Sequence, residues 1–465
     1  MINISLISCG PSARRAVEWI DLMPSSPPGN RMSDQPYLEA VKQQYEAFPY
    51  PPRDPADETR RLRHALSGNL LLINHHCFRG KRDFRTGFRC LVAGAGTGDT
   101  VIYLAEQLRH YDAEVVYLDM SSAAQEVAQA RARVRGLTNI TWVTASIMQL
   151  PELGLGEFDY IECCGVLHHL ESTEAGLQAL NAVLKDDGAL FLMLYGKYGR
   201  QAVYDMQALL RTYLPAGLSM QEKIQSTRRL LDALPKSNSF VRNLAAWKSE
   251  IAIDGGGDAG LYDLLLHSQD RCFDVPGLYA LAQSAGLHLL SFAHGADAYD
   301  PMNHVTDRGV AEYIESLDLP QQQALAEQFV GSIRKHAFFL ARKPKRGASL
   351  RDEDLALRSF GTLFENAPKL AADMLPGRTI RYADPEYSFQ IPCTPITGPV
   401  YAHMDGKTSL RTLRKRILKS VSGATPTMID RELEQIYRQL HPRGYLYLLN
   451  AGSYGVKLPD YATLR

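Results

Sequence analysis

The fold of this 465-residue chain is indicated most clearly by one stretch, Val92-Ala93-Gly94-Ala95-Gly96-Thr97-Gly98-Asp99. It follows a short apolar run, 89–93, and precedes a helical pattern, 100–108. A glycine-rich turn between a strand and a helix lets the backbone approach a ligand closely, and the helix N-terminus offers free N–H groups. The stretch therefore predicts a strand, a ligand-binding turn and a helix in direct succession.

Strands and helices keep alternating beyond this unit. Six further apolar strands are predicted at 114–118, 140–143, 158–163, 189–194, 287–292 and 336–341. Strands that alternate with helices of this size indicate a parallel sheet with helices on both faces. We therefore predict an α/β fold with a doubly wound, seven-stranded, mostly parallel sheet.

The rest of the chain divides around this sheet. The predicted parts are a disordered or mis-assigned extension at 1–31, an N-terminal helical arm or lid at 32–87, the α/β domain at 88–345 with a helical insertion at 200–266, and a C-terminal module at 346–465. The module shows two helical patterns and then a strand-like stretch, which favours a small α+β, winged-helix-like unit.

The amino-acid composition argues against several classes of protein. Lys and Arg number 51, as do Asp and Glu, and this balance argues against a globally basic nucleic-acid binder. Seven scattered cysteines form neither a disulfide framework nor a zinc pattern, so we expect no metal and a reducing, cytoplasmic setting. No apolar run is long enough to span a membrane.

The acid after the second predicted strand indicates what the glycine turn binds. Asp119 lies about 20 residues past the glycines, where a carboxylate can take both hydroxyls of a ribose. Gly94, Gly96 and Gly98 give G-x-G-x-G, and Asp99 stands where a dinucleotide site needs its last glycine. No Gly-Lys-Ser/Thr follows, which excludes a P-loop. The pattern predicts a nucleoside-containing cofactor other than NAD.

Three blocks carry a family resemblance. They are 91–98, 117–121 (Tyr-Leu-Asp-Met-Ser) and 158–170 (Phe-Asp-Tyr-Ile-Glu-Cys-Cys-Gly-Val-Leu-His-His-Leu). Together they resemble class I S-adenosylmethionine-dependent methyltransferases, nearest to a bacterial branch often fused to tetratricopeptide repeats, and the resemblance covers roughly residues 40–343. It implies a Rossmann-like methyltransferase fold, S-adenosyl-L-methionine as cofactor and methyl transfer as the activity.

The resemblance also implies positions for the cofactor. The methionine moiety would lie beside Gly94, Ala95, Gly96 and Gly98, the ribose at Asp119, the adenine against Met120, Ser146 and Ile147, and the sulfonium near Cys163. Many relatives carry an acid where this chain has Val92, and many carry one where it has Ser146. Each change removes one contact, typically worth about 1 kcal/mol.

No fixed catalytic residue follows from this fold. A methyl group on a sulfonium is already activated, so aligning the acceptor is the main task, and a base helps only when the acceptor must lose a proton. His168 is the predicted base if one is used; the alternative is that His168 and His169 are structural. Tyr45, Tyr50 and Arg53 would form a lid, or an arm packed on the sheet edge.

Three functions remain open. The first is an active methyltransferase with a small-molecule or peptide acceptor, as a monomer or homo-oligomer. The second is a catalytically silent, methyltransferase-like scaffold or binding protein, for which Val92 and Ser146 speak. The third is an RNA or DNA methyltransferase, which the balanced charge disfavours.

Overall fold

The computed structural model describes residues 36–252, 256–293, 295–344, 347–360, 367–383 and 388–451. The predicted extension at 1–31 lies outside the described residues, as does the predicted domain boundary at 345–346. Among the described helices, none is both long and apolar enough to cross a lipid bilayer.

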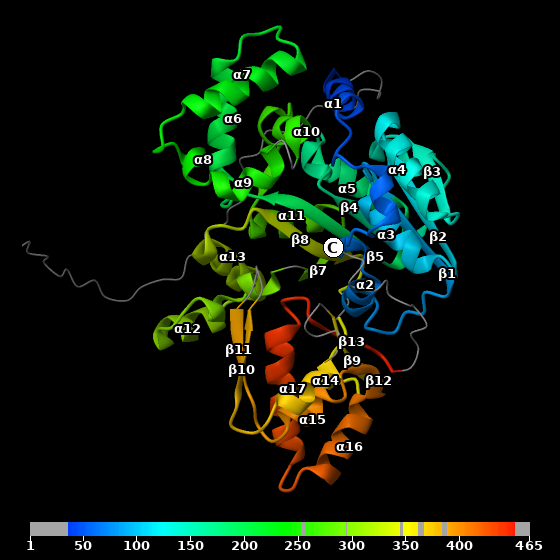
Figure 1. Ribbon diagram of the computed structural model, residues 1–465, viewed down its shortest axis with the longest axis vertical. Coiled ribbons are helices and arrows are strands. Elements are labelled where there is room, and N and C mark those ends of the chain that lie inside the picture. The colour runs from blue at the N-terminus through cyan, green and yellow to red at the C-terminus, as the bar shows by residue number, and fades with distance from the viewer. Residues whose placement is uncertain are drawn as a thin grey trace, which may run out of the picture. The chain divides into compact units, whose positions relative to one another are not determined.

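A mostly parallel sheet forms the centre of the fold (Figure 1). Its strands are β1 (Thr86–Ala93), β2 (Asp112–Asp119), β3 (Ile140–Thr144), β4 (Phe158–Cys164), β5 (Leu184–Gly196), β7 (His288–Phe292) and β8 (Lys335–Ala341), in the order β3-β2-β1-β4-β5-β8-β7. A two-residue strand, β6 (Cys272–Phe273), pairs with the end of β5. Among the described strands of this sheet, β8 alone runs antiparallel to its two neighbours. The predicted α/β sheet of seven mostly parallel strands is confirmed.

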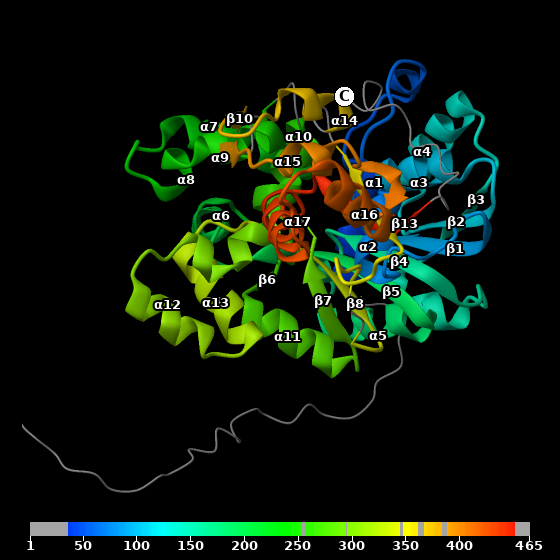
Figure 2. The same cartoon turned by 90° about the horizontal axis from the view of Figure 1, so that it is seen from below.

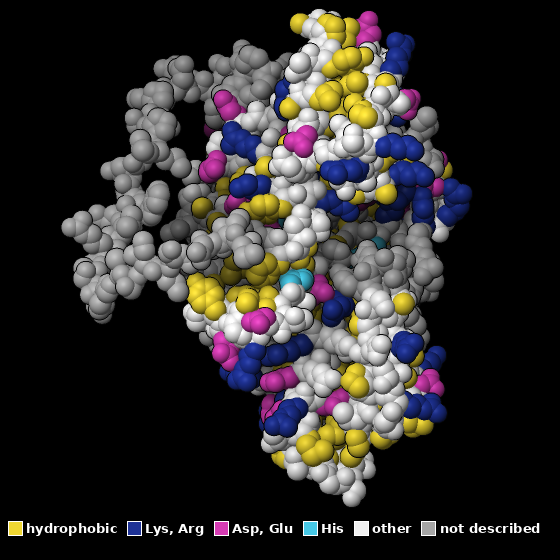
Figure 3. Space-filling view, turned by 90° about the vertical axis from the view of Figure 1, so that its left-hand side faces the viewer, with side chains coloured by type: hydrophobic (Ala, Val, Ile, Leu, Met, Phe, Trp, Pro, Cys, Tyr) yellow, Lys and Arg dark blue, Asp and Glu magenta, His cyan; other side chains and the backbone are white. Residues whose placement is uncertain are grey.

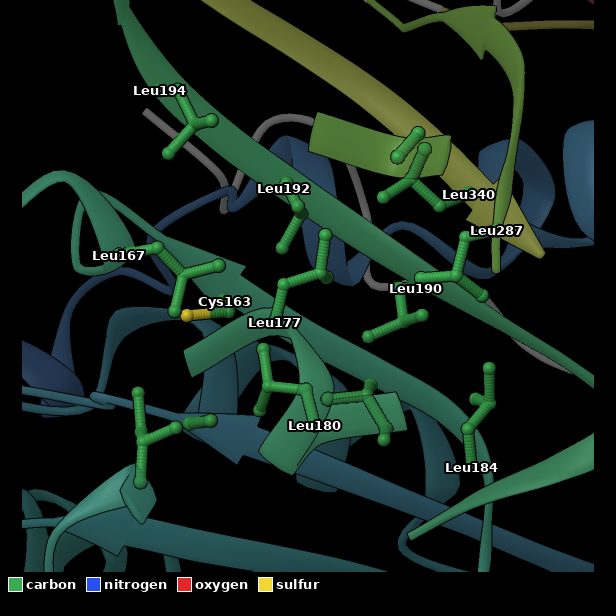
Figure 4. Packing of buried hydrophobic residues seen from close by; sticks show 14 of the residues in the cluster. Cys163, Leu167, Leu177, Leu180, Leu184, Leu190, Leu192, Leu194, Leu287 and Leu340 are labelled. Atoms are coloured by element: carbon green, nitrogen blue, oxygen red, sulfur yellow. The ribbon is translucent and has the colours of Figure 1, made fainter. Parts of the chain in front are cut away.

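Helices cover both faces of this sheet. The elements on and around it are α1 (Pro36–Ala47), η1 (Pro55–Thr59), η2 (Leu66–Gly68), α2 (Leu70–Cys77), α3 (Asp99–Leu108), α4 (Ser122–Arg135), η3 (Ile147–Glu152), η4 (Leu167–His169), α5 (Thr173–Ala182), α11 (Val275–Ser284), η6 (Ala296–Tyr299), η7 (Pro301–Asn303), α12 (Arg308–Glu315) and α13 (Leu319–Val330). Apolar side chains of α5 and α11 pack on one face, as Figure 4 shows for α5, and those of α2, α3 and α4 pack on the other. Burial on both faces explains why these strands read as continuous apolar runs.

The helix α2 begins later than the local sequence pattern indicates. The apolar pattern at 62–73 favours one helix, but the chain forms a 3₁₀ turn and then α2 from Leu70. The Asn69 side chain accepts a hydrogen bond from the Leu71 N–H and so caps the helix at its start. Asn69 was the sequence signal that marked this boundary.

The helical insertion has its own apolar centre. It comprises α6 (Gln201–Tyr213), α7 (Met220–Ala233), α8 (Ser239–Arg242), α9 (Leu244–Ile251), α10 (Gly257–Leu261) and a π-helical turn, η5 (Tyr262–Leu266). Phe240, Trp247 and Leu261 are buried at its centre, and Phe48 from the N-terminal arm packs against this group. Lys and Arg side chains lie on both the upper and the lower part of the face in Figure 3, with the largest group at the right of the upper part.

The C-terminal part forms a separate three-stranded antiparallel sheet, ordered β12-β9-β13. Its elements are β9 (Leu355–Ser359), α14 (Ala367–Leu370), η8 (Ala371–Asp373), β10 (Thr379–Ala383), β11 (Ser388–Pro392), α15 (Thr397–Tyr401), β12 (Asp405–Ser409), α16 (Leu410–Ser420), α17 (Pro426–Leu440) and β13 (Leu446–Asn450). His75 of α2 bonds both the Tyr437 hydroxyl and the Leu448 N–H, so α2 lies against α17 and β13 (Figure 2). The winged-helix-like assignment stays a prediction.

Candidate active site

A cavity of about 290 Å³ opens at the carboxyl ends of β1, β2 and β4, the edge where parallel sheets of this type hold ligands. Seven of the predicted cofactor residues line it: Gly94, Ala95, Gly96, Asp119, Met120, Ser146 and Ile147. Residues of the N-terminal arm and of the insertion line its other walls. One cavity thus joins the predicted cofactor residues to parts of the chain far away in sequence.

The glycine turn is folded tightly under the N-terminal arm. Gly96 has φ +52°, and a Cβ there would stand 2.5 Å from the Tyr50 carbonyl oxygen. Gly98 has φ +93° and precedes α3, but it faces Ala128 and does not line the cavity. The Thr97 hydroxyl donates to the Pro51 carbonyl at 2.6 Å. Glycine is therefore required here for a close backbone crossing as well as for conformation.

Asp119 is oriented by backbone donors. Its Oδ2 accepts the Gly96 N–H at 2.7 Å, and its Oδ1 accepts the Ser121 N–H at 2.9 Å. Burial raises the pKa of this carboxyl, and the backbone hydrogen bonds oppose that rise. The carboxylate is thereby fixed at the cavity wall, and each oxygen retains a lone pair for a ligand hydroxyl.

Ser146 has a structural task besides lining the cavity. Its hydroxyl accepts the Met148 N–H at 3.3 Å, and its N–H donates to the Gln149 side chain at 2.9 Å. These two bonds form a capping box at the start of η3. Ile147, next along the chain, is buried and supplies apolar surface to the cavity.

Sequence reasoning missed the acid that lies beside Val92. Glu162 on β4 is the register partner of Val92 on β1, lines the cavity and is only 2% exposed. The hydroxyls of Ser67 and Thr100 donate to its Oε1 at 2.8 and 3.2 Å. Burial raises its pKa to about 7, against the effect of those hydroxyls. A carboxyl group therefore stands next to the position where Val92 lacks one.

Besides Gly98, two of the predicted site residues, Cys163 and His168, do not line the cavity. Cys163 is fully buried in the core beside Leu167 and Leu177 (Figure 4), and its neighbour Cys164 lines the cavity instead. Successive strand residues point to opposite faces, so a one-residue shift moves a side chain from site to core. His168 is likewise fully buried and its ring packs on Tyr195. The residue that lines the cavity is His169.

Hydrogen bonds assign the tautomer of His169. Its Nδ1 lies 2.7 Å from the Gln269 carbonyl oxygen and must donate the proton of that bond, which leaves a lone pair on Nε2. That Nε2 is buried and has no hydrogen-bond partner among the described residues. His267 stacks on His169 at 3.8 Å and accepts the Gln269 N–H through its own Nδ1. His169 thus presents a free acceptor and His267 a free donor.

Acidic and phenolic groups complete this end of the cavity. Asp263 of η5 accepts the Tyr45 hydroxyl at 3.0 Å and lies 3.5 Å from that of Tyr195. One ligating atom each of His169, Asp263 and His267 lie within 4.8 Å of one another. To bind a metal there, His267 would have to give up either the hydrogen bond that its Nδ1 accepts from the Gln269 N–H or the proton on its Nε2. The hydrogen bonds suit proton transfer better than metal ligation.

Three comparisons place the chain among known proteins. The methyltransferase domain family model matches residues 91–190. An uncharacterized protein of Synechococcus is 28% identical over 327 residues, 69% of this chain and 76% of that protein. The ubiquinone/menaquinone biosynthesis C-methyltransferase of Shewanella oneidensis is 29% identical over 126 residues, 26% of this chain and 49% of that enzyme.

A solved structure extends the likeness over most of the chain. PKMT2 from Rickettsia typhi, in complex with AdoHcy, superposes with a TM-score of 0.60 and 17% identity, over 83% of this chain and 76% of that protein. At this identity the likeness concerns the fold. The branch fused to tetratricopeptide repeats stays a prediction. The sheet order and the site at its carboxyl edge agree with the matched family: residues 91–190 form a methyltransferase domain, and the chain is similar to class I S-adenosylmethionine-dependent methyltransferases.

Proposed function

We propose that the protein transfers the methyl group of S-adenosylmethionine to a small-molecule or peptide acceptor that enters the histidine end of the cavity. The observation that carries this is one cavity with the cofactor residues at one end and, at the other, a His169 Nε2 that is bonded by none of the described residues. The acceptor's lone pair forms the new bond to the methyl carbon, and the C–S electron pair stays on sulfur. A methyl-labelling screen of extracts and peptides tests it: labelled acceptor supports the proposal, and its absence overturns it.

Different residues of the cavity would bind different parts of S-adenosylmethionine. Asp119 would accept both ribose hydroxyls, Met120 and Ile147 would pack on the adenine, and the glycine turn would pass the methionine moiety. Glu162 would hold the methionine ammonium in place of the acid absent at Val92. This arrangement removes the main support for a silent scaffold, since the cavity retains a carboxylate where sequence comparison suggested a loss.

The base is proposed to be His169 and no longer His168. His169 has the free lone pair and the place in the cavity wall, whereas His168 is packed beneath it. General base catalysis of this kind contributes about 10²–10⁴-fold to a rate. The bond to Gln269 fixes the ring so that its free nitrogen keeps one orientation.

His169→Gln should lower kcat by about 100-fold because the proton of the acceptor then has no positioned base. The dissociation constant of S-adenosylmethionine should stay within about threefold, since His169 lies at the acceptor end. His168→Gln is the matched control and should retain kcat within about fivefold. Steady-state kinetics and titration measure both; equal losses in the two variants would contradict the assignment of the base.

Glu162→Gln should weaken S-adenosylmethionine binding about tenfold or more at pH 8, where the carboxylate is charged. The pKa of about 7 makes the wild-type affinity fall by about tenfold from pH 8 to pH 6, because only the ionised form attracts the ammonium. The Gln variant should lose this pH dependence. Titration calorimetry at both pH values is the measurement, and an unchanged pH profile in the variant would refute the role.

Stability provides the control for that variant. The folded-state pKa of Glu162 is raised above its unfolded value, so the protonated carboxyl favours the folded state at low pH. This contribution to stability is lost as pH rises through about 7. Glu162→Gln should therefore melt no lower than the wild type at pH 8. Weak binding by a variant that remains fully folded then reports on the cofactor contact alone.

A further inference from the structure

Asp263 is a buried carboxylate without a basic partner. It is 6% exposed, lies on the π-helical turn η5 and lines the cavity. Its hydrogen bonds come from the neutral hydroxyls of Tyr45 and Tyr195. Burial raises the pKa of both phenols, so they remain protonated donors. Among the described residues, no Lys or Arg forms an ion pair with Asp263.

Neighbouring acids differ from Asp263 in this respect. Glu250 pairs with Lys335 at 3.9 Å, and Asp270 pairs with buried Arg200 at 3.5 Å. Asp263 is therefore the acid at this end of the cavity whose charge is left for a ligand. A buried carboxylate held only by neutral donors is costly, and a bound cation would offset that cost. Pi-helical turns occur frequently at functional sites.

The other walls near Asp263 suit a cation. Tyr45 and Tyr50 line the cavity, and aromatic rings attract ammonium groups through their faces. A phenolate or thiolate acceptor would instead be repelled by the carboxylate. His169, whose ligating atom lies within 4.8 Å of that of Asp263, can take a proton from a group bound there.

We propose that the acceptor is an amine, bound as its ammonium at Asp263; this rests on the proposed function. One N–H proton of the ammonium passes to His169 Nε2, which frees the nitrogen lone pair. That lone pair forms the N–CH₃ bond as the S–CH₃ bond breaks, and the C–S electron pair stays on sulfur as S-adenosylhomocysteine forms. Asp263 holds the nitrogen throughout and stabilises the positive charge that the methylated amine carries.

A cofactor analogue tests the charge at this place without knowledge of the natural acceptor. Sinefungin carries an amine-bearing carbon in place of the methylated sulfonium, so its ammonium occupies the position of methyl transfer. The wild type should bind sinefungin at least tenfold more tightly than S-adenosylhomocysteine. Asp263→Asn should lose this preference while its affinity for S-adenosylhomocysteine stays within about threefold. Asp270→Asn, the acid already paired to Arg200, should keep the preference.

Different outcomes would overturn the proposed function and the amine acceptor. Failure of S-adenosylhomocysteine to bind the wild type would overturn the proposed function itself. Normal binding without a sinefungin preference, or a preference retained in Asp263→Asn, would overturn only the amine acceptor. Should the variant fail to fold, the wild-type complex with S-adenosylhomocysteine is titrated with n-butylammonium and with 1-butanol. Saturable binding of the ammonium alone supports the proposal, and equal or absent binding of the two probes overturns it.

Discussion

Asp119→Ala should weaken S-adenosylmethionine binding about 100-fold. A carboxylate that accepts two ribose hydroxyls makes two hydrogen bonds to a charged group, each worth about 1.5–3 kcal/mol. The substitution also frees the Gly96 N–H, which Asp119 now holds at 2.7 Å, so the glycine turn loses part of its support. Calorimetric titration of the folded variant measures the loss.

Ser146→Ala is the control from the same cavity wall. The Ser146 hydroxyl is engaged in capping η3, so its removal should change the affinity by less than about fivefold, near the worth of one hydrogen bond. If Asp119→Ala bound S-adenosylmethionine as tightly as Ser146→Ala, Asp119 could not be the ribose ligand.

Glu58→Gln should destabilise the fold more than other single changes near the site. Glu58 is buried and accepts hydrogen bonds from Nε and Nη2 of Arg131 at 2.8 and 2.6 Å. It also forms an ion pair with Arg135. Arg131 in turn donates to the Thr97 carbonyl in the glycine turn and to Asp99. Removing one partner of a buried pair costs about 3–5 kcal/mol, because the other charge stays buried.

The expected readout is a fall of the thermal unfolding midpoint by roughly 5 °C or more. Asp57→Asn, one residue earlier, is the matched control: Asp57 pairs with Arg60 and Arg61 at the surface, and its loss should leave the midpoint unchanged. Similar midpoints for the two variants would show that the Glu58–Arg131 contact does not hold the arm to α4.

Most of the central sheet could be predicted from local sequence patterns. The glycine turn, the strand before it and Asp119 were predictable, because each depends on residues adjacent in the chain and on one spacing. The strands β9, β10, β11 and β12 were missed. The short strand β9 pairs with β13 about 90 residues later and with β12, and β10 and β11 form a separate short hairpin. Pairing at such separations leaves little local signal.

The acceptor end could not be predicted in the same way. Asp263 and Tyr45 meet across 218 residues, and only the fold brings them together. Choosing His169 over His168, or Cys164 over Cys163, requires knowing which of two adjacent side chains faces the cavity. Glu162 left one usable signal: an acid inside an apolar strand next to β1, at a point where β1 itself carries Val92.

Titration of the wild-type protein with S-adenosylmethionine measures directly whether the cavity binds the methyl donor. We expect one saturable site per chain, with a dissociation constant of about 1–100 µM, inside the usual range for enzyme substrates. S-adenosylhomocysteine should compete for the same site. No heat of binding at S-adenosylmethionine concentrations up to about 1 mM, with the protein folded, would contradict this expectation.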